Sequence, residues 1–286
     1  MNKNKLQEMR QKVLENHDEL SPNEILGAVK QSLTQNIEVL DKFLRLETGR
    51  TISAQEIDEI FTPDINNKYG AENTPIMNDF GLLSTNFIPL GIVFVDVNYS
   101  LPIENYLQLL KVLIETKNSI IIKPHQEFRT LEAFVTIIND VLTRLPATNG
   151  IEVVNHDVYN FDIDAVVYVG EKREFNKLDG KFQKIHVGVG RYELYVDEEI
   201  DKKLIEDAKS KNVQIFYPQE NVFDLINQEG GNYATAIMST NPDKIKEFMR
   251  DVKSSFKFVN ISPTNIRRVN LFPEQLLTRQ TTVVYK

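Results

Sequence analysis

The sequence predicts an α/β fold with a doubly wound, largely parallel sheet. Apolar runs rich in β-branched residues alternate along the chain with longer segments of helical periodicity, which is typical of such folds. The clearest unit spans residues 89–127, where two apolar runs, 91–97 and 119–122, flank a helical segment that begins at Pro102. Because a strand, a helix and a second strand form a right-handed crossover, the two runs are predicted to be adjacent parallel strands.

Three helices are expected before this unit, each marked by apolar residues at helical spacing. They cover residues 5–15, 24–46 and 54–61. Two of them begin with a capping box, in which a serine and a glutamate three residues later satisfy each other's backbone N–H groups. These pairs are Ser21 with Glu24 and Ser53 with Glu56. Residues 63–88 are rich in Asn, Pro and Gly and are predicted to form a loop or crossing segment.

Strands and helices continue to alternate after the central unit. The remaining strands are expected at residues 150–154, 165–169, 185–189, 213–217, 233–239, 256–260 and 279–286. The remaining helices are expected at residues 131–145, 199–211, 222–228 and 242–252. This alternation favours parallel strands joined by crossover helices over an antiparallel architecture.

Composition excludes several classes of function. The 286 residues include 41 acidic and 33 basic side chains, so the net charge of −8 argues against nucleic acid or an anionic membrane surface as main partner. The absence of cysteine excludes disulfides, thiolate metal sites and a cysteine nucleophile. Without an apolar segment long enough for a signal peptide or a membrane span, a cytoplasmic location is the default expectation.

Several segments resemble the aldehyde dehydrogenase superfamily, including its gamma-glutamyl phosphate reductase branch, and they occur in the family's order. Residues 46–51 (LETGRT) resemble an ETGK-type turn, 89–93 (PLGIV) a PLGVV strand, and 118–124 (NSIIIKP) a GNTVVLKP strand. Further similar segments are 168–170 (YVG), 188–191 (GVGR), 196–201 (VDEEID), 231–237 (GNYATAI) and 258–260 (FVN).

The resemblance implies a Rossmann-like domain and a second α/β lobe. The Rossmann-like domain is expected at residues 89–210, with the helices of residues 1–62 packed on it. Residues 211–265 are expected to form a reduced catalytic-like lobe, and residues 266–286 a tail and strand. The lobe is called reduced because few residues separate 211 from 233, where the family carries the cysteine-bearing half of its catalytic domain.

The resemblance also implies which catalytic roles are vacant. Such enzymes attack an aldehyde or acyl carbon with a cysteine thiolate, hold the oxyanion with an asparagine, and exchange hydride with NAD(P). Ser100 stands where the asparagine would be, and Val187 where the general-base glutamate would be. We therefore expect a catalytically degenerate protein, or pseudoenzyme, that serves as a binding or regulatory module. The alternative is an NAD(P)-dependent oxidoreductase acting on an aldehyde or acyl substrate without a cysteine nucleophile.

Lys123, Glu127 and Gly170 are the candidates for binding NAD(P). The resemblance implies that Lys123, at a strand end, hydrogen-bonds a ribose hydroxyl. No G-x-G-x-x-G follows the strand at 150–154, and Asp157 and Asp162 would repel a pyrophosphate. The favoured interpretation of Lys123 is therefore a solvated strand-end lysine.

Other candidate groups have simpler interpretations. Three of the four histidines, His125, His156 and His186, lack the spacing of a metal site. The acidic run 197–201 is interpreted as a favourable helix start rather than a cation site. Arg267 and Arg268 are expected to be solvated or ion-paired. Residues 279–286 form a terminal strand able to pair across a subunit boundary, which predicts a homodimer. A small metabolite or nucleotide remains a possible ligand.

Overall fold

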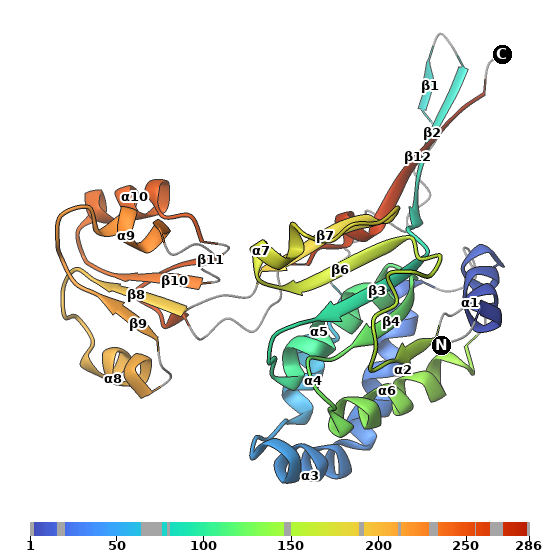
Figure 1. Ribbon diagram of the computed structural model, residues 1–286, viewed down its shortest axis with the longest axis horizontal. Helices are drawn as coiled ribbons and strands as arrows, with labels where there is room; N and C mark the ends of the chain where they lie inside the picture. Colours follow the sequence, from blue (N-terminus) through green and yellow to red (C-terminus); the bar gives the residue numbers. More distant parts are fainter. Residues whose placement is uncertain are drawn as a thin grey trace. The chain divides into compact units, whose positions relative to one another are not determined.

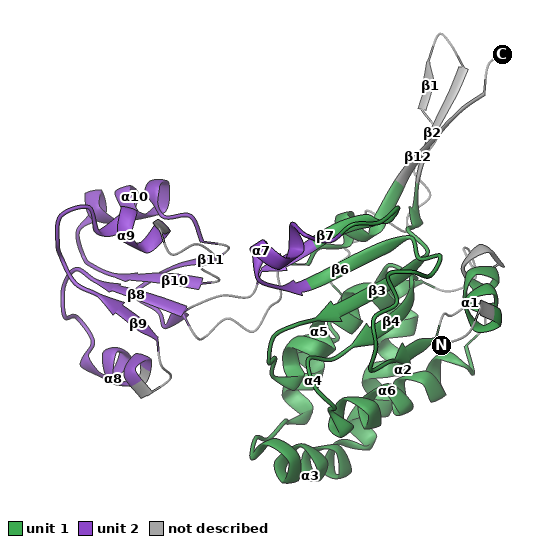
Figure 2. Cartoon of the chain, viewed as in Figure 1, with its two compact units in different colours: residues 1–168, 179–185, 271–286 green, residues 169–178, 186–270 purple. Residues whose placement is uncertain are grey.

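The chain folds into two compact units (Figure 2). The first comprises residues 1–168, 179–185 and 271–286, and the second comprises residues 169–178 and 186–270. The computed structural model describes residues 3–15, 21–63, 76–78, 81–145, 150–188, 192–210, 213–228, 234–254, 256–263 and 271–284. The sequence predicts a boundary at residue 210, whereas the second unit already includes the strand and helix before that position.

The first unit is built on a five-stranded sheet of order β5-β4-β3-β6-β7 (Figure 1), apart from residues 169–170 and 186–188 at the ends of β6 and β7, which belong to the second unit. These strands are β3 (Ile92–Val97), β4 (Ser119–Lys123), β5 (Ile151–Val153), β6 (Ala165–Gly170) and β7 (Gln183–Gly188). β4 pairs in parallel with both β3 and β5. The backbone N–H of Asp164 donates to Ile92 and that of Gln183 to Asp164, so β6 and β7 begin beside the start of β3. The doubly wound sheet is thus confirmed, with its switch point between β3 and β6.

Helices pack on this sheet in two groups (Figure 1). α5 (Ile103–Glu115) packs on β4 and α6 (Arg129–Leu142) on β5. α2 (Pro22–Gln35), α3 (Ile37–Thr48) and α4 (Ala54–Ile60) pack in turn on α5 or α6, or on both, whereas α1 (Lys3–Glu15) contacts β3 and β4. Among the helices that the structure describes, none is long and apolar enough to cross a membrane.

The structure confirms both predicted capping boxes, but it divides one predicted helix into two. Both capping boxes are present, at Ser21 with Glu24 and at Ser53 with Glu56. The single helix predicted at residues 24–46 is wrong, because Asn36 interrupts it between α2 and α3. The Asn36 side chain donates to the Ser32 carbonyl oxygen at 2.9 Å, a local hydrogen bond that competes with helix continuation.

The segment at residues 63–88, predicted to be a loop or crossing segment, contains strands in its second half. β1 (Ile76–Asn78) and β2 (Gly81–Pro89) join β12 (Leu277–Val284) in an antiparallel sheet of order β1-β2-β12. β2 and β12 pair continuously, from Pro89 with Leu277 to Leu82 with Val284. The 3-10 helix η2 (Pro273–Leu276) leads into β12. One of the two strands paired with β2, β12, thus comes from the other end of the chain, which local sequence cannot show.

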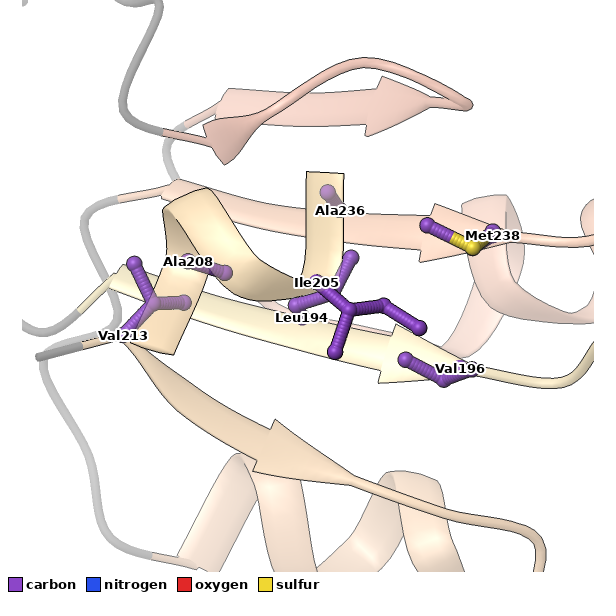
Figure 3. Close-up of a cluster of buried hydrophobic side chains, with 7 residues drawn as sticks. All are labelled: Leu194, Val196, Ile205, Ala208, Val213, Ala236 and Met238. Carbon is purple, nitrogen blue, oxygen red and sulfur yellow. The ribbon is translucent and has the colours of Figure 1, made fainter. Parts of the chain in front are cut away.

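The second unit contains a four-stranded parallel sheet of order β11-β10-β8-β9. Its strands are β8 (Tyr192–Val196), β9 (Gln214–Phe216), β10 (Ala234–Met238) and β11 (Phe256–Val259), and its helices are α7 (Lys172–Phe175), α8 (Lys202–Ser210), α9 (Val222–Gln228) and α10 (Pro242–Asp251). Leu194 and Val196 pack with Ile205 of α8 (Figure 3), whereas Tyr195 packs with Phe223 of α9 and Phe248 of α10. Alternate residues of β8 therefore contribute to two separate cores, one on each face of the sheet.

Candidate functional site

A cleft of about 690 Å³ lies at the carboxyl ends of β4 and β5. Its walls are residues 123–127, Glu132 of α6, and residues 152–157. Ligands of parallel α/β sheets bind at this edge of the sheet, and the volume is within the usual range for small-molecule sites. The cleft is therefore the candidate binding site of the first unit.

Lys123 is fixed in the cleft wall by two carboxylates. Its Nζ lies 2.7 Å from Asp96 Oδ1 and 2.5 Å from Asp157 Oδ1, and the Lys123 and Asp96 side chains are only 17% and 3% exposed. Burial opposes the charge of Lys123, but the hydrogen bonds and charges of Asp157 and Asp96 outweigh it and raise the pKa of Lys123 above its usual value. The solvated lysine that the sequence favours is therefore wrong, because this ammonium group is ion-paired within the protein.

Tyr159 completes this cluster from the segment that follows β5. Its hydroxyl donates to Asp96 Oδ2. The ring packs edge-on against Phe94, with centroids 5.4 Å apart, and stacks on Phe182 at 6.0 Å. Burial and the neighbouring Asp96 carboxylate raise the pKa of Tyr159 above its usual value, so the phenol remains a proton donor. Asp96, at the switch-point strand β3, is thus bonded by two side chains of the same chain.

The crossover between β5 and β6 contains no helix, since residues 154–164 are all described and none is helical. Asp164 anchors its end by accepting the N–H of Ile92 at 2.8 Å. Gly91 permits this approach, because its φ is +127° and a Cβ there would lie 2.3 Å from Asp164 Oδ2. A dinucleotide site uses a glycine-rich turn and a helix N-terminus at this point of the fold, and residues 154–164 supply no helix N-terminus and no glycine.

The N-terminus of α6, near the cleft, is capped by a side chain from another helix. Glu47, at the end of α3, accepts the backbone N–H groups of Arg129 at 2.9 Å and Thr130 at 2.8 Å, at the start of α6. Burial raises the pKa of Glu47, but the hydrogen bonds from Thr130 and Arg129 outweigh burial, and the pKa is lowered overall. Glu47 belongs to the family-like segment 46–51, yet nothing in its sequence context identifies α6 as its partner.

The other predicted site residues lie apart from this cluster or at its edge. Glu127 is exposed at the cleft and pairs with Arg129 at 3.2 Å. Ser100 is exposed after β3. Val187 is buried in β7, and Gly170 ends β6 with its carbonyl oxygen 2.9 Å from His186 Nε2. Val187 and Gly170 belong to the second unit, whereas Ser100, Lys123 and Glu127 belong to the first.

The remaining candidates have structural partners. Asp201 accepts the N–H groups of Lys203 and Leu204, which confirms the helix-start interpretation for this residue. Asp197 accepts the Ser239 hydroxyl at 2.6 Å. His125 and His156 both line the cleft, and no metal-binding group of three side chains occurs in the described part of the chain. Gly190, Arg191, Arg267 and Arg268 lie outside the described residues.

Comparison with known proteins shows similarity in structure only. No family model matches the sequence, and no curated protein matches it. The glyceraldehyde-3-phosphate dehydrogenase of Methanocaldococcus jannaschii, solved with NADP, aligns with a TM-score of 0.74 at 14% identity, over 100% of this chain and 95% of that chain.

Two further solved structures agree with this result. The acetylating aldehyde dehydrogenase of Geobacillus thermoglucosidasius aligns with a TM-score of 0.68 at 12% identity, over 98% of this chain and 97% of that one. The gamma-glutamyl phosphate reductase of Thermotoga maritima aligns with a TM-score of 0.64 at 11% identity, over 99% and 98% of the two chains. The chain therefore has the fold of the aldehyde dehydrogenase superfamily.

Proposed function

We propose that the chain is a catalytically degenerate protein of aldehyde dehydrogenase fold that acts as a binding or regulatory module. The proposal places its ligand in the cleft at the carboxyl ends of β4 and β5. The observation that carries it is the ion pair of Lys123 with Asp96 and Asp157, because this pairing occupies the lysine that the family resemblance assigns to the cofactor.

The proposal that the chain is catalytically degenerate is supported by the residue types at the family's catalytic positions. The chain contains no cysteine, so no thiolate is available to attack an aldehyde carbon. Ser100 and Val187, which stand at the family's asparagine and glutamate positions, supply neither the amide donor nor the general base. We assign none of the family's roles of nucleophile, oxyanion donor and general base to the remaining residues, and we therefore assign no catalytic step to this chain.

The free energies of the two interactions favour the internal ion pairs of Lys123 over a contact between Lys123 and a cofactor. Removing one partner from a buried ion pair costs about 3–5 kcal/mol. A hydrogen bond between Lys123 and a ribose hydroxyl would return about 1.5–3 kcal/mol, the net value for a bond to a charged group. Moving Lys123 away from its carboxylates to reach a ribose is therefore unfavourable, although those carboxylates take only two of the three N–H donors of the ammonium group. Glu127 adds a negative charge at the same cleft, and the carbonyl oxygen of Gly170 is already in contact with His186.

The alternative function is an NAD(P)-dependent oxidoreductase that acts on an aldehyde or acyl substrate without a cysteine. Its support is the fold, together with the NADP bound in the M. jannaschii enzyme. Incubation of the protein with short aldehydes and either NAD or NADP distinguishes the two functions. The pseudoenzyme proposal predicts no formation of reduced nicotinamide above a protein-free control, and sustained formation would overturn it.

We also propose a homodimer formed through β12. In the sheet order β1-β2-β12 this strand has β2 on one side and no described strand on the other, so the proposal gives that second edge to a second chain. Light scattering at micromolar concentration tests this proposal, since a monomer mass would remove it. A cytoplasmic location stays a prediction of the sequence.

A further inference from the structure

We infer that the cleft at the carboxyl ends of β4 and β5 takes an organic cation of the aliphatic polyamine class. This inference rests on the proposed binding function and specifies its ligand. The cleft has room for a small molecule, at about 690 Å³, and the side chains around it set the sign of the charge it accepts.

Carboxylates reach the cleft from several elements. Glu127 lies in the turn after β4, Glu132 on α6, Glu152 on β5, and Asp157 in the segment after β5. The one ammonium group among the lining residues is that of Lys123, and its charge is offset by Asp157 and by Asp96 beneath it. The lining therefore carries excess negative charge.

Two of these carboxylates are available to a ligand. Glu152 is paired with Lys5 of α1. Glu127 pairs with Arg129, but both side chains are more than 70% exposed, so the pair is weak and exchangeable. Glu132 has no ion pair among the described residues, and it is exposed on α6. Glu127 and Glu132 are thus the groups expected to meet ammonium groups of the ligand.

The groups that would favour an anion are absent or occupied. The charge of Lys123 is offset by Asp96 and Asp157, the α6 N-terminus is capped by Glu47, and residues 154–164 provide no helix. A nucleotide phosphate would meet carboxylates without a compensating donor. An ammonium group would instead be attracted by the carboxylates of Glu127 and Glu132.

Titration calorimetry of the full chain with spermidine at low ionic strength tests the inference. We expect saturable one-site binding. Each of Glu127→Gln and Glu132→Gln should weaken it about fivefold, and the double variant about 25-fold, because each removes one carboxylate. Glu38→Gln removes an equally exposed carboxylate from α3, outside the cleft, and should leave the affinity unchanged.

Other outcomes separate the inference from the proposed function. Equal losses in Glu132→Gln and Glu38→Gln would show unspecific attraction to the acidic protein and overturn the inference. Binding of ATP, CoA or NADPH but not of spermidine would also overturn it, while leaving a binding function in place. Absence of binding by all four compounds would overturn the inference and count against the proposed function as well.

Discussion

Lys123 Nζ lies 2.7 Å from Asp96 Oδ1, joining the end of β4 to the end of β3 at the ligand-binding edge of the sheet. In a sheet of this topology the ends of these strands are where a dinucleotide would lie. Here the two residues form an ion pair, and the Tyr159 hydroxyl donates a hydrogen bond to the same carboxylate. The ends of β3 and β4 are thus joined by an ion pair within the chain.

Lys123→Met should destabilise the protein by about 3 kcal/mol, because it leaves the buried Asp96 carboxylate without its cation. Urea denaturation measures the change. The control is Lys30→Met, which removes a pair with Asp58 of 2.8 Å whose side chains are 35% and 62% exposed. That loss should be below about 1 kcal/mol. Equal losses in the two variants would contradict a buried role for Lys123.

Lys111→Met should destabilise the protein by about 3–5 kcal/mol. Lys111 and Glu115 form a 2.8 Å ion pair along α5, and their side chains are 3% and 0% exposed. The single variant leaves a buried carboxylate, whereas the double variant Lys111→Met/Glu115→Leu removes both charges and should recover most of the loss. A double-mutant cycle by urea denaturation measures this, and a double variant less stable than Lys111→Met would refute the pairing argument.

Glu47→Gln should weaken the cap of α6 by about 0.5–2 kcal/mol at neutral pH. Since the folded pKa of Glu47 is lowered, its contribution is present above the unfolded value of 4.5 and is lost as the pH falls through the folded value. Unfolding free energies measured from neutral pH down to below 4.5 should fall less steeply in the variant. Equal slopes of unfolding free energy against pH in the variant and the unmodified protein would show that the charge of Glu47 does not stabilise the N-terminus of α6.

His186→Gln should reduce the loss of stability on mild acidification. Burial lowers the pKa of His186 below its usual 6.5, only partly opposed by the Gly170 carbonyl oxygen, and Lys172 lowers it further. The unfolded chain therefore binds the proton more readily, and stability falls as the pH drops through 6.5 toward the folded value. Urea midpoints on either side of this window measure the effect, and an unchanged slope in the variant would contradict it.

The sequence predicted the central β3-α5-β4 unit well because its signals are local. Continuous apolar strands and a helix beginning after Pro102 suffice to define it. β2 was missed because its partner, β12, lies at the other end of the chain. β8 was missed as a strand because Glu193 interrupts its apolar pattern, although that residue is buried beside Thr235.

The sequence indicated that Lys123 ends a strand but not which side chains surround it. Lys123 was located correctly at a strand end, yet its partners Asp96 and Asp157 come from two other parts of the sheet edge. Their convergence depends on the strand order, which no sequence spacing reveals. The cap of α6 by Glu47 depends in the same way on the packing of α3 against α6.

Titration calorimetry of the full chain with NADP tests the central claim most directly. If Lys123 is held by Asp96 and Asp157, no saturable binding should appear up to about 1 mM NADP, a limit that corresponds to about −4 kcal/mol. One-site binding tighter than about 0.1 mM that is lost in Lys123→Met would contradict the account. It would mean that the ion pair opens and that Lys123 still serves a dinucleotide.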